Sequence, residues 1–387
     1  MDWVKLGDCF KFIRNGASIK QFGSEGLPIT RIETISDRTV NKEKVGYANI
    51  KYPEYSEYYL KYNDILMSHI NSESHLGKVA IYKDKTDEVI IHGMNLLCLR
   101  SNENFLADYL YYFFNSIIFK NQINKIMKKS VNQASFNITN LKDLKVPNIT
   151  ISKQKNIVER LAKVEILIQT RQDQVQALDD LVESTLYSFL NNERNKCELL
   201  GDIFEIKSGA TPSRKNEDYW NSNDIPWVKS NQLTGEIINS AEEYISEKGY
   251  KNSSTYMFPK NTVLIAMYGQ GKTRGQVGLL NIETTTNQAI AGLIPTDCVN
   301  MKFIFYQLKN MYENLRSYSQ GGNQKNLSVT LLKQIKIILP PIEKQNLFAA
   351  FVEKIEKQKR ILNDSLEELN DLFDSLMQDA FDGSMAK

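Results

Sequence analysis

The chain has 387 residues, of which 42% are hydrophobic and 24% are charged, and its formal net charge is +2 at pH 7. These values predict a soluble, cytoplasmic protein of two or three domains. They exclude a membrane-spanning helix, because no apolar run approaches the required length of about 18 residues. The first residues, Met1–Lys5, do not resemble a signal peptide.

The chain is internally duplicated, because residues 6–193 recur in altered form at 200–384. The run Leu6–Asp8 returns as Leu200–Asp202, and the offset between the copies stays between 191 and 198. Such self-similarity has to be recognised before any fold is assigned. Two copies are too few for a solenoid, so the duplication predicts a pseudo-twofold arrangement.

Each copy begins with a variable domain of mixed α and β character, which predicts the α+β class. Short apolar runs predict strands at Gly26–Ile32, Ile65–Ser68 and Lys78–Tyr82, and again at Ile225–Val228, Thr262–Ala266 and Gln276–Leu280. Residues 106–127 and 302–316 have helical patterns.

The copies diverge in the connection between matched strands, which we call variable loop 1 (residues 69–78) and variable loop 2 (residues 268–276). Divergent loops on a shared scaffold are where binding residues are expected. Both loops carry side chains of the kinds that contact base edges in DNA, together with Gly, which permits close backbone approach. An ordinary polar hairpin is the alternative interpretation.

A second candidate surface is formed by late loop 1 (residues 128–133) and late loop 2 (residues 319–326), which are equally compatible with solvated turns. The candidate DNA-binding residues of the first copy are His69, Asn71, Ser72, Ser74, His75, Lys78, Lys128, Lys129, Asn132 and Gln133. Those of the second copy are Lys207, Arg214, Lys215, Tyr268, Gln270, Lys272, Thr273, Arg274, Gln276, Asn323, Gln324 and Lys325.

Each copy ends in a long amphipathic segment with an apolar period of 3.5, which is typical of a coiled coil. Roughly 40 residues at about 1.5 Å rise would make each helix about 60 Å long. The predicted seam of the first helix contains Leu161, Val164, Ile168, Val175, Leu178, Val182 and Phe189. The seam of the second contains Val352, Ile355, Leu362, Leu366, Leu369, Phe373 and Leu376.

Polar residues interrupt this seam at Arg171, Thr185 and Lys359. Ser152 is the expected N-cap of the first helix, whereas Pro340 and Pro341 precede the second and Gly383 is expected to end it. Two unrelated amphipathic helices on separate cores are the alternative. The shared register of the two seams favours pairing of the helices with each other.

Charge is distributed unevenly along the chain. Residues 152–193 contain five basic and seven acidic residues, and residues 343–382 contain five basic and ten acidic residues. The remaining blocks therefore carry a net charge of about +9, which suits a polyanion bound at the variable domains and not along the helices.

The sequence contains no pattern that indicates an active site. Gly271-Lys272-Thr273 resembles the end of a phosphate-binding loop, but Ala266 stands where the first Gly is required. The three histidines, His69, His75 and His92, lack metal-ligand spacing. Cys9, Cys98, Cys197 and Cys298 form no C-x-x-C pair, so we expect four reduced and mostly buried thiols without zinc or disulfides.

The order of variable domain, long helix, variable domain and long helix resembles the specificity (S) subunit of type I restriction-modification systems over essentially the whole chain. The most family-like stretches are Leu200–Ser213, Tyr219-Trp220 with Ile225-Pro226-Trp227, and Ile338–Gln345. The chain departs from the family at Val146–Thr150, where a Pro-Pro entry would stand, and at Lys153 and Lys344, where Glu is frequent.

The resemblance implies a non-catalytic DNA-recognition subunit with four segments: recognition domain 1 at 1–150, spacer helix 1 at 151–195, recognition domain 2 at 196–341 and spacer helix 2 at 342–387. Each recognition domain would bind one half of a bipartite, asymmetric DNA target. The helices would pair antiparallel as a coiled coil, set the gap between the half-sites and dock two modification (M) subunits.

The same resemblance places S-adenosylmethionine and adenine methylation in the M subunits. It places ATP, Mg and DNA cleavage in restriction (R) subunits, and it leaves this chain without a cofactor or metal. The alternative function is a coiled-coil scaffold whose variable domains bind proteins, and a self-contained nuclease or methyltransferase is a more distant one.

Overall fold

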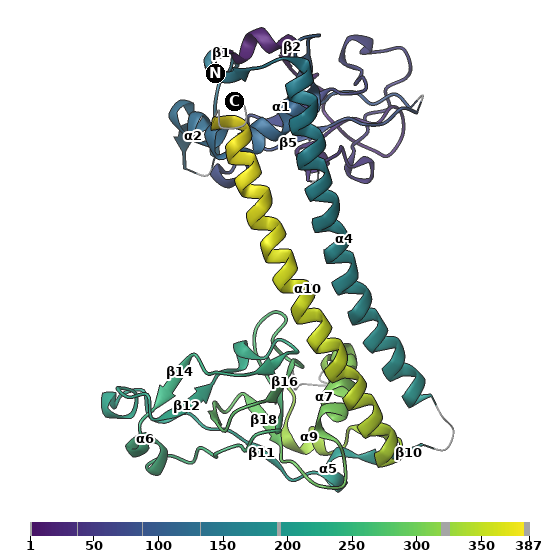
Figure 1. Ribbon diagram of the computed structural model, residues 1–387. Helices are drawn as coiled ribbons and strands as arrows, with labels where there is room; N and C mark the ends of the chain where they lie inside the picture. Colours follow the sequence, from purple (N-terminus) through teal and green to yellow (C-terminus); the bar gives the residue numbers. More distant parts are fainter. Residues whose placement is uncertain are drawn as a thin grey trace. The chain divides into compact units, whose positions relative to one another are not determined.

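The computed structural model describes residues 2–36, 38–86, 88–131, 133–191, 195–318 and 326–382 (Figure 1). The chain forms two compact units. Unit 1 contains Met1–Gln172 and Asp364–Lys387, and unit 2 contains Asp173–Asn363. Each unit therefore holds one variable domain together with part of each long helix.

Variable domain 1 is built on an antiparallel sheet with the strand order β2-β6-β3-β5. Its strands are β2 (Phe10–Asn15), β6 (Leu96–Ser101), β3 (Ile65–Ser68) and β5 (Val79–Ile81). Ile65 and Met67 of β3 join the larger core, whereas Leu66 between them joins a smaller one. This alternation follows from the two-residue period of a strand, so both faces of the sheet are covered.

The remaining elements of unit 1 surround this sheet. The helices are α1 (Ala107–Asn115), α2 (Ile117–Ile126) and α3 (Ile138–Asp143), with short 3₁₀ helices η1 (Leu6–Cys9), η2 (Ile32–Ile35), η3 (Lys42–Lys44), η4 (Ser56–Tyr58) and η5 (Glu73–His75). Two small antiparallel sheets complete the unit, one from β1 (Asp2–Lys5) and β9 (Lys145–Asn148), the other from β4 (Ile70–Asn71), β8 (Gln133–Ser135) and β7 (Lys128–Ser130).

Variable domain 2 repeats this plan with the order β11-β18-β15-β16-β13. The main sheet contains β11 (Ile206–Ser208), β18 (Ile290–Leu293), β15 (Val263–Ala266), β16 (Val277–Leu280) and β13 (Ile237–Ile238), the last added parallel to β16. A second sheet contains β14 (Glu243–Ile245), β12 (Ile225–Val228) and β17 (Thr285–Thr286), and β10 (Lys196–Leu199) pairs with β19 (Lys336–Leu339). The short helices are α5 (Leu200–Ile203), α6 (Glu247–Lys251), α7 (Met301–Asn310), α8 (Tyr312–Ser317), α9 (Val329–Lys333), η6 (Glu217–Tyr219) and η7 (Ser230–Gln232).

The repeated Leu-Gly-Asp run has a packing reason in both copies. A Cβ atom on Gly7 would lie 3.0 Å from Cβ of Lys142, and one on Gly201 would lie 2.7 Å from Cβ of Lys333. The first turn of each domain thus passes so close to α3 or α9 that a larger residue would push the two elements apart.

The two long helices are α4 (Ile151–Leu190) and α10 (Ile342–Asp382). All fourteen of the predicted seam residues are buried or half-buried. In unit 2, the rings of Phe189 and Phe348 lie 6.0 Å apart and the Lys359 ammonium lies 2.5 Å from the Asp179 carboxylate. Because the residue numbers run in opposite directions in these two pairs, the helices are antiparallel within this unit.

In unit 1, the corresponding parts of the two helices share the core of variable domain 1. Ile157 and Leu161 of α4 belong to the same hydrophobic cluster as Met377 and Phe381 of α10. The Phe381 ring lies 5.3 Å from that of Tyr109 in α1. Each variable domain therefore packs on both long helices.

Several predictions about local structure were wrong in detail. Residues 26–32 form no strand, since only Ile29 makes isolated bridges, to Gly46 and Ile91, and η2 begins at Ile32. The helical character predicted for residues 106–127 and 302–316 is confirmed, with two helices in each segment that meet at Ser116 and at Met311.

The first long helix also begins earlier than the expected cap at Ser152. Thr150 precedes its first residue, and the Thr150 carbonyl accepts from Gln154 N at 3.0 Å. Pro341 precedes the second helix as expected, whereas Gly383 lies outside the described residues. Cys9 and Cys98 are buried thiols, but Cys197 and Cys298 are exposed, which corrects the expectation of mostly buried thiols.

Candidate nucleic-acid interface

The same backbone hydrogen bonds close both variable loops. Gly77 N donates to Ser68 O and Ser68 N donates to Lys78 O, each at 2.9 Å. In the second copy, Gly275 N donates to Ala266 O at 2.9 Å and Ala266 N donates to Gln276 O at 2.8 Å. Gly77 and Gly275 both have positive φ, 78° and 84°, which glycine adopts without strain. The two loops therefore begin and end in equivalent backbone structure, and they differ in the side chains that they carry.

Variable loop 1 is stabilised by its own side chains. The Ser68 hydroxyl donates to the His75 carbonyl at 2.5 Å. The Nδ1 atom of His75 lies 2.9 Å from the Ser72 hydroxyl and 3.0 Å from the Ser74 hydroxyl. Ser72, Ser74 and His75 are exposed, as a DNA-contacting role requires, and Asn71 and Lys78 are half-buried.

Late loop 1 lies beside variable loop 1, because both contribute to the β4-β8-β7 sheet. Asn71 is paired with Ala134, which is paired in turn with Lys129. The Lys129 ammonium also lies 2.6 Å from the Glu73 carboxylate. The sheet thus joins the two predicted surfaces of the first copy into one, with Lys128, Lys129 and Gln133 exposed. Asn132 lies outside the described residues.

His69 was predicted to be a DNA contact, but it is buried in the structure. Only 9% of this residue is exposed, and its ring lies 6.5 Å from the Phe136 ring. Burial lowers the pKa of the His69 imidazole. His69 therefore lies beneath the loop and is part of its support.

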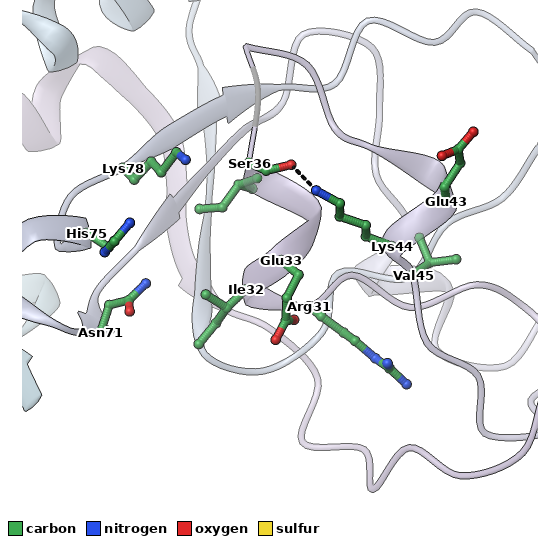
Figure 2. A pocket seen from close by; sticks show the side chains of 11 residues that line it. Arg31, Ile32, Glu33, Ser36, Glu43, Lys44, Val45, Asn71, His75 and Lys78 are labelled. Carbon is green, nitrogen blue, oxygen red and sulfur yellow. Dashed lines mark hydrogen bonds between the residues drawn. The ribbon is translucent and has the colours of Figure 1, made fainter. Parts of the chain in front are cut away.

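A cavity of about 670 Å³ lies against variable loop 1 (Figure 2). Asn71, His75 and Lys78 are grouped on one side of it. The opposite side is lined by Arg31, Ile32, Glu33, Ile35, Ser36, Glu43, Lys44 and Val45. Sequence reasoning missed this second wall, because its residues lie more than 20 positions before the loop in a segment that has no periodic pattern.

Variable loop 2 is held from outside, by α8. The Tyr312 hydroxyl donates to the Lys272 carbonyl at 2.7 Å. The Arg316 guanidinium donates to the carbonyls of Gly271 and Arg274 at 3.0 and 3.2 Å. Neither residue was singled out in the sequence, since their contribution is to the backbone of the loop and not to a recognisable motif.

The side chains of variable loop 2 differ in exposure. Gln270 and Lys272 are exposed, whereas Tyr268, Thr273, Arg274 and Gln276 are half-buried. Leu327 N donates to Met267 O at 2.9 Å, as Phe136 N does to His69 O at 3.2 Å in the first copy. Asn323, Gln324 and Lys325 lie outside the described residues.

Two of the other candidates in the second copy already have acidic partners. The Lys207 ammonium lies 3.1 Å from the Glu205 carboxylate, whose hydrogen bond raises the pKa of Lys207. The Arg214 guanidinium lies 2.5 Å from the Glu243 carboxylate and stacks 3.4 Å from the centre of the Trp220 ring. Lys215 is exposed. If Lys207 or Arg214 binds DNA, its positive charge is shared between a phosphate and the neighbouring carboxylate.

In the described ranges, no cluster of three or more His, Cys, Asp or Glu residues could hold a metal ion. No helix there is both long and apolar enough to cross a membrane.

Comparison with known proteins identifies a family. The model of the type I restriction modification DNA specificity domain matches residues 1–177 and again residues 195–371. A putative type I restriction enzyme MjaX specificity subunit from Methanocaldococcus jannaschii is 33% identical over 386 residues, covering 92% of this chain and 87% of that protein. The EcoR124I/EcoR124II specificity subunit from Escherichia coli is 24% identical over 172 residues, covering 43% of this chain and 42% of that protein.

Solved structures share the fold at low sequence identity. A chain from a study of complex assembly and conformational transition of the type I R-M system superposes with a TM-score of 0.64 at 15% identity, covering 98% of this chain and 97% of its own. The S subunit of a type I restriction-modification system from M. genitalium gives a TM-score of 0.57 at 15% identity, covering 98% and 96%.

Proposed function

This chain belongs to the type I restriction-modification DNA specificity family, and on that premise we propose that its two variable domains recognise the two halves of a bipartite, asymmetric DNA target. The observation that carries this proposal is the pair of loops closed by the same backbone hydrogen bonds. An equivalent scaffold presents Asn71, His75 and Lys78 in one copy and Gln270, Lys272 and Arg274 in the other. Different side chains on equivalent supports recognise different base sequences.

Exposed lysines of the variable domains supply the part of the affinity that does not depend on sequence. Lys128 and Lys129 in the first copy and Lys215 in the second are exposed. Contacts of such residues with phosphates position the protein on DNA, whereas contacts with base edges specify the sequence.

The helices α4 and α10 set the gap between the half-sites and dock two modification subunits. Large apolar side chains on their outer faces support a docking role, because Ile166, Leu167 and Ile361 are 64%, 50% and 61% exposed. Side chains of this size and exposure are typical of protein interfaces.

Catalysis belongs to partner subunits in this proposal. The modification subunits supply S-adenosylmethionine and methylate an adenine in each half-site, and restriction subunits supply ATP- and Mg-dependent cleavage. The chain itself carries no cofactor and is not an enzyme.

The test is to produce the chain with its modification subunits and to measure binding and methylation on duplexes randomised at two sites with a variable gap. We expect a bipartite motif with one methylated adenine in each half, and binding that weakens steeply between low and physiological salt. Binding without any sequence preference would contradict the proposal. Methylation or cleavage of DNA by the chain alone would contradict the assignment of catalysis to partners.

A further inference from the structure

The cavity beside variable loop 1 contains two opposite charges that do not pair with each other. Glu33 and Lys78 line it from opposite sides. Neither the Glu33 carboxylate nor the Lys78 ammonium has a hydrogen-bond or ion-pair partner among the residues that the structure describes. A site with an available acceptor on one wall and an available donor on the other fits a ligand that presents both kinds of group.

Most of the other polar groups of the cavity have partners, but the Glu43 carboxylate, like that of Glu33, has none among the residues that the structure describes. The Lys44 ammonium donates to the Ser36 hydroxyl at 2.9 Å, and the Arg31 guanidinium donates to Oε1 of Gln21. The Nδ1 atom of His75 lies within hydrogen-bond distance of the Ser72 and Ser74 hydroxyls. These contacts leave the Lys78 ammonium available on one wall and the carboxylates of Glu33 and Glu43 available on the other.

The chemistry of a G·C base pair matches this pair of groups. In the major groove, guanine presents the acceptors O6 and N7, which lysine contacts, and cytosine presents the N4 amino donor, which a carboxylate accepts. An A·T pair offers a different pattern, for which Asn71 on the same wall as Lys78 is the suitable side chain.

We propose that Glu33 and Lys78 together recognise one G·C base pair in the half-site bound by variable domain 1. The Lys78 ammonium donates to guanine, and the Glu33 carboxylate accepts from the amino group of cytosine. This inference rests on the proposed function and extends the recognition site to the wall of the cavity opposite variable loop 1.

The experiment uses the chain produced together with its modification subunits and a duplex library randomised at both half-sites. Glu33→Gln removes the negative charge at constant size, and Lys78→Met removes the positive charge while keeping an unbranched side chain. Glu25→Gln and Lys51→Met are the matched controls, because both residues are exposed in the same domain and neither lines the cavity. The preference at the other half-site reports whether each variant is folded and assembled.

We expect both cavity variants to lower the preference for G·C by about tenfold or more at the same base pair. The second half-site and both controls should remain as in the unmodified complex. Unchanged preferences in the first half-site, effects at two different positions, or an equal loss of affinity for all sequences would overturn the inference. If the unmodified complex shows no preference at either half-site, the proposed function itself fails, and this result is visible before any variant is made.

Discussion

Gln154 and Gln345 occupy the same place in the two copies, as the fourth residue of each long helix, and both are buried. Gln154 accepts from Leu106 N at 2.8 Å and donates to Asn104 O at 2.8 Å. Gln345 accepts from Asn300 N at 3.0 Å and donates to Pro340 O at 2.8 Å. Each glutamine therefore ties the start of a long helix to the chain entering α1 or α7.

Replacing Gln154 with Leu should lower the free energy of unfolding by about 2 to 3 kcal/mol, because buried backbone groups would lose their partners. Gln172→Leu is the control, since Gln172 is exposed on the same helix. Denaturant unfolding of the two variants measures the difference. Equal losses in both would show that the buried hydrogen bonds of Gln154 contribute nothing.

His92 is fully buried, and its Nε2 atom lies 2.9 Å from the Leu96 carbonyl oxygen. Burial is the main cause that lowers the pKa of His92 from 6.5 to about 4. Because the folded pKa is depressed, the folded state favours the neutral ring. Its contribution to stability is full above pH 6.5 and is lost as the pH falls toward 4.

We expect His92→Gln to remove this part of the pH dependence, which amounts to about 3 kcal/mol between pH 7 and pH 4. The measurement is the free energy of unfolding at several pH values, compared as slopes because the variant can also change the absolute stability. Parallel pH profiles of the two proteins would contradict the assignment of this dependence to His92.

Among the elements, helix α8 holds the backbone of variable loop 2 in place. The carbonyls to which Tyr312 and Arg316 donate belong to Gly271, Lys272 and Arg274. Because three backbone positions are fixed, the exposed side chains Gln270 and Lys272 extend from a defined base.

Tyr312→Phe and Arg316→Met should therefore reduce base discrimination at the second half-site, by several-fold for the first variant and more for the second. Discrimination at the first half-site should not change. Binding of the complex to libraries randomised at each half-site measures both effects, with Tyr318→Phe as the control because Tyr318 is exposed just after α8. A uniform loss of binding at both half-sites would indicate loss of folding and not loss of positioning.

Elements with a strong local pattern were predictable. The strands around Leu66 and Leu264 and the two long helices have continuous apolar signals, and the structure confirms them. The expected strand at residues 26–32 was wrong, because an apolar run predicts a strand only when a neighbour offers a continuous edge. Ile29 finds single bridges to two different partners instead.

For the whole molecule, the proposed function makes the lengths of α4 and α10 determine the gap between the two half-sites. Deleting Asp173–Asp179 from α4 and Lys359–Ser365 from α10 would shorten both helices by about 10 Å. The Lys359–Asp179 ion pair places these two heptads opposite each other at one end. Removing a whole heptad from each helix keeps the 3.5-residue seam in register.

We expect the preferred gap of the assembled complex to shorten by about three base pairs or binding to the bipartite site to be lost, since one base pair rises about 3.4 Å. Binding to duplexes with a series of gap lengths measures this shift, and deletions in only one helix are the control that should abolish binding. Full activity with an unchanged gap would contradict a spacing role of the helices.

The amino-acid sequence alone was enough to predict the duplication, the positions of the long helices, the buried positions along their seams and the loops in which the copies differ. Apolar periodicity and the alignment of one copy with the other reveal these features, and both can be read from the order of the residues. Only the folded structure brings late loop 1 beside variable loop 1 through β4 and β8, places Glu33 and Lys78 in the lining of one cavity, and lets Tyr312 and Arg316 bind the backbone of variable loop 2. Each of these depends on which distant segments the fold brings together, and no periodic signal encodes contacts between residues that lie tens of positions apart.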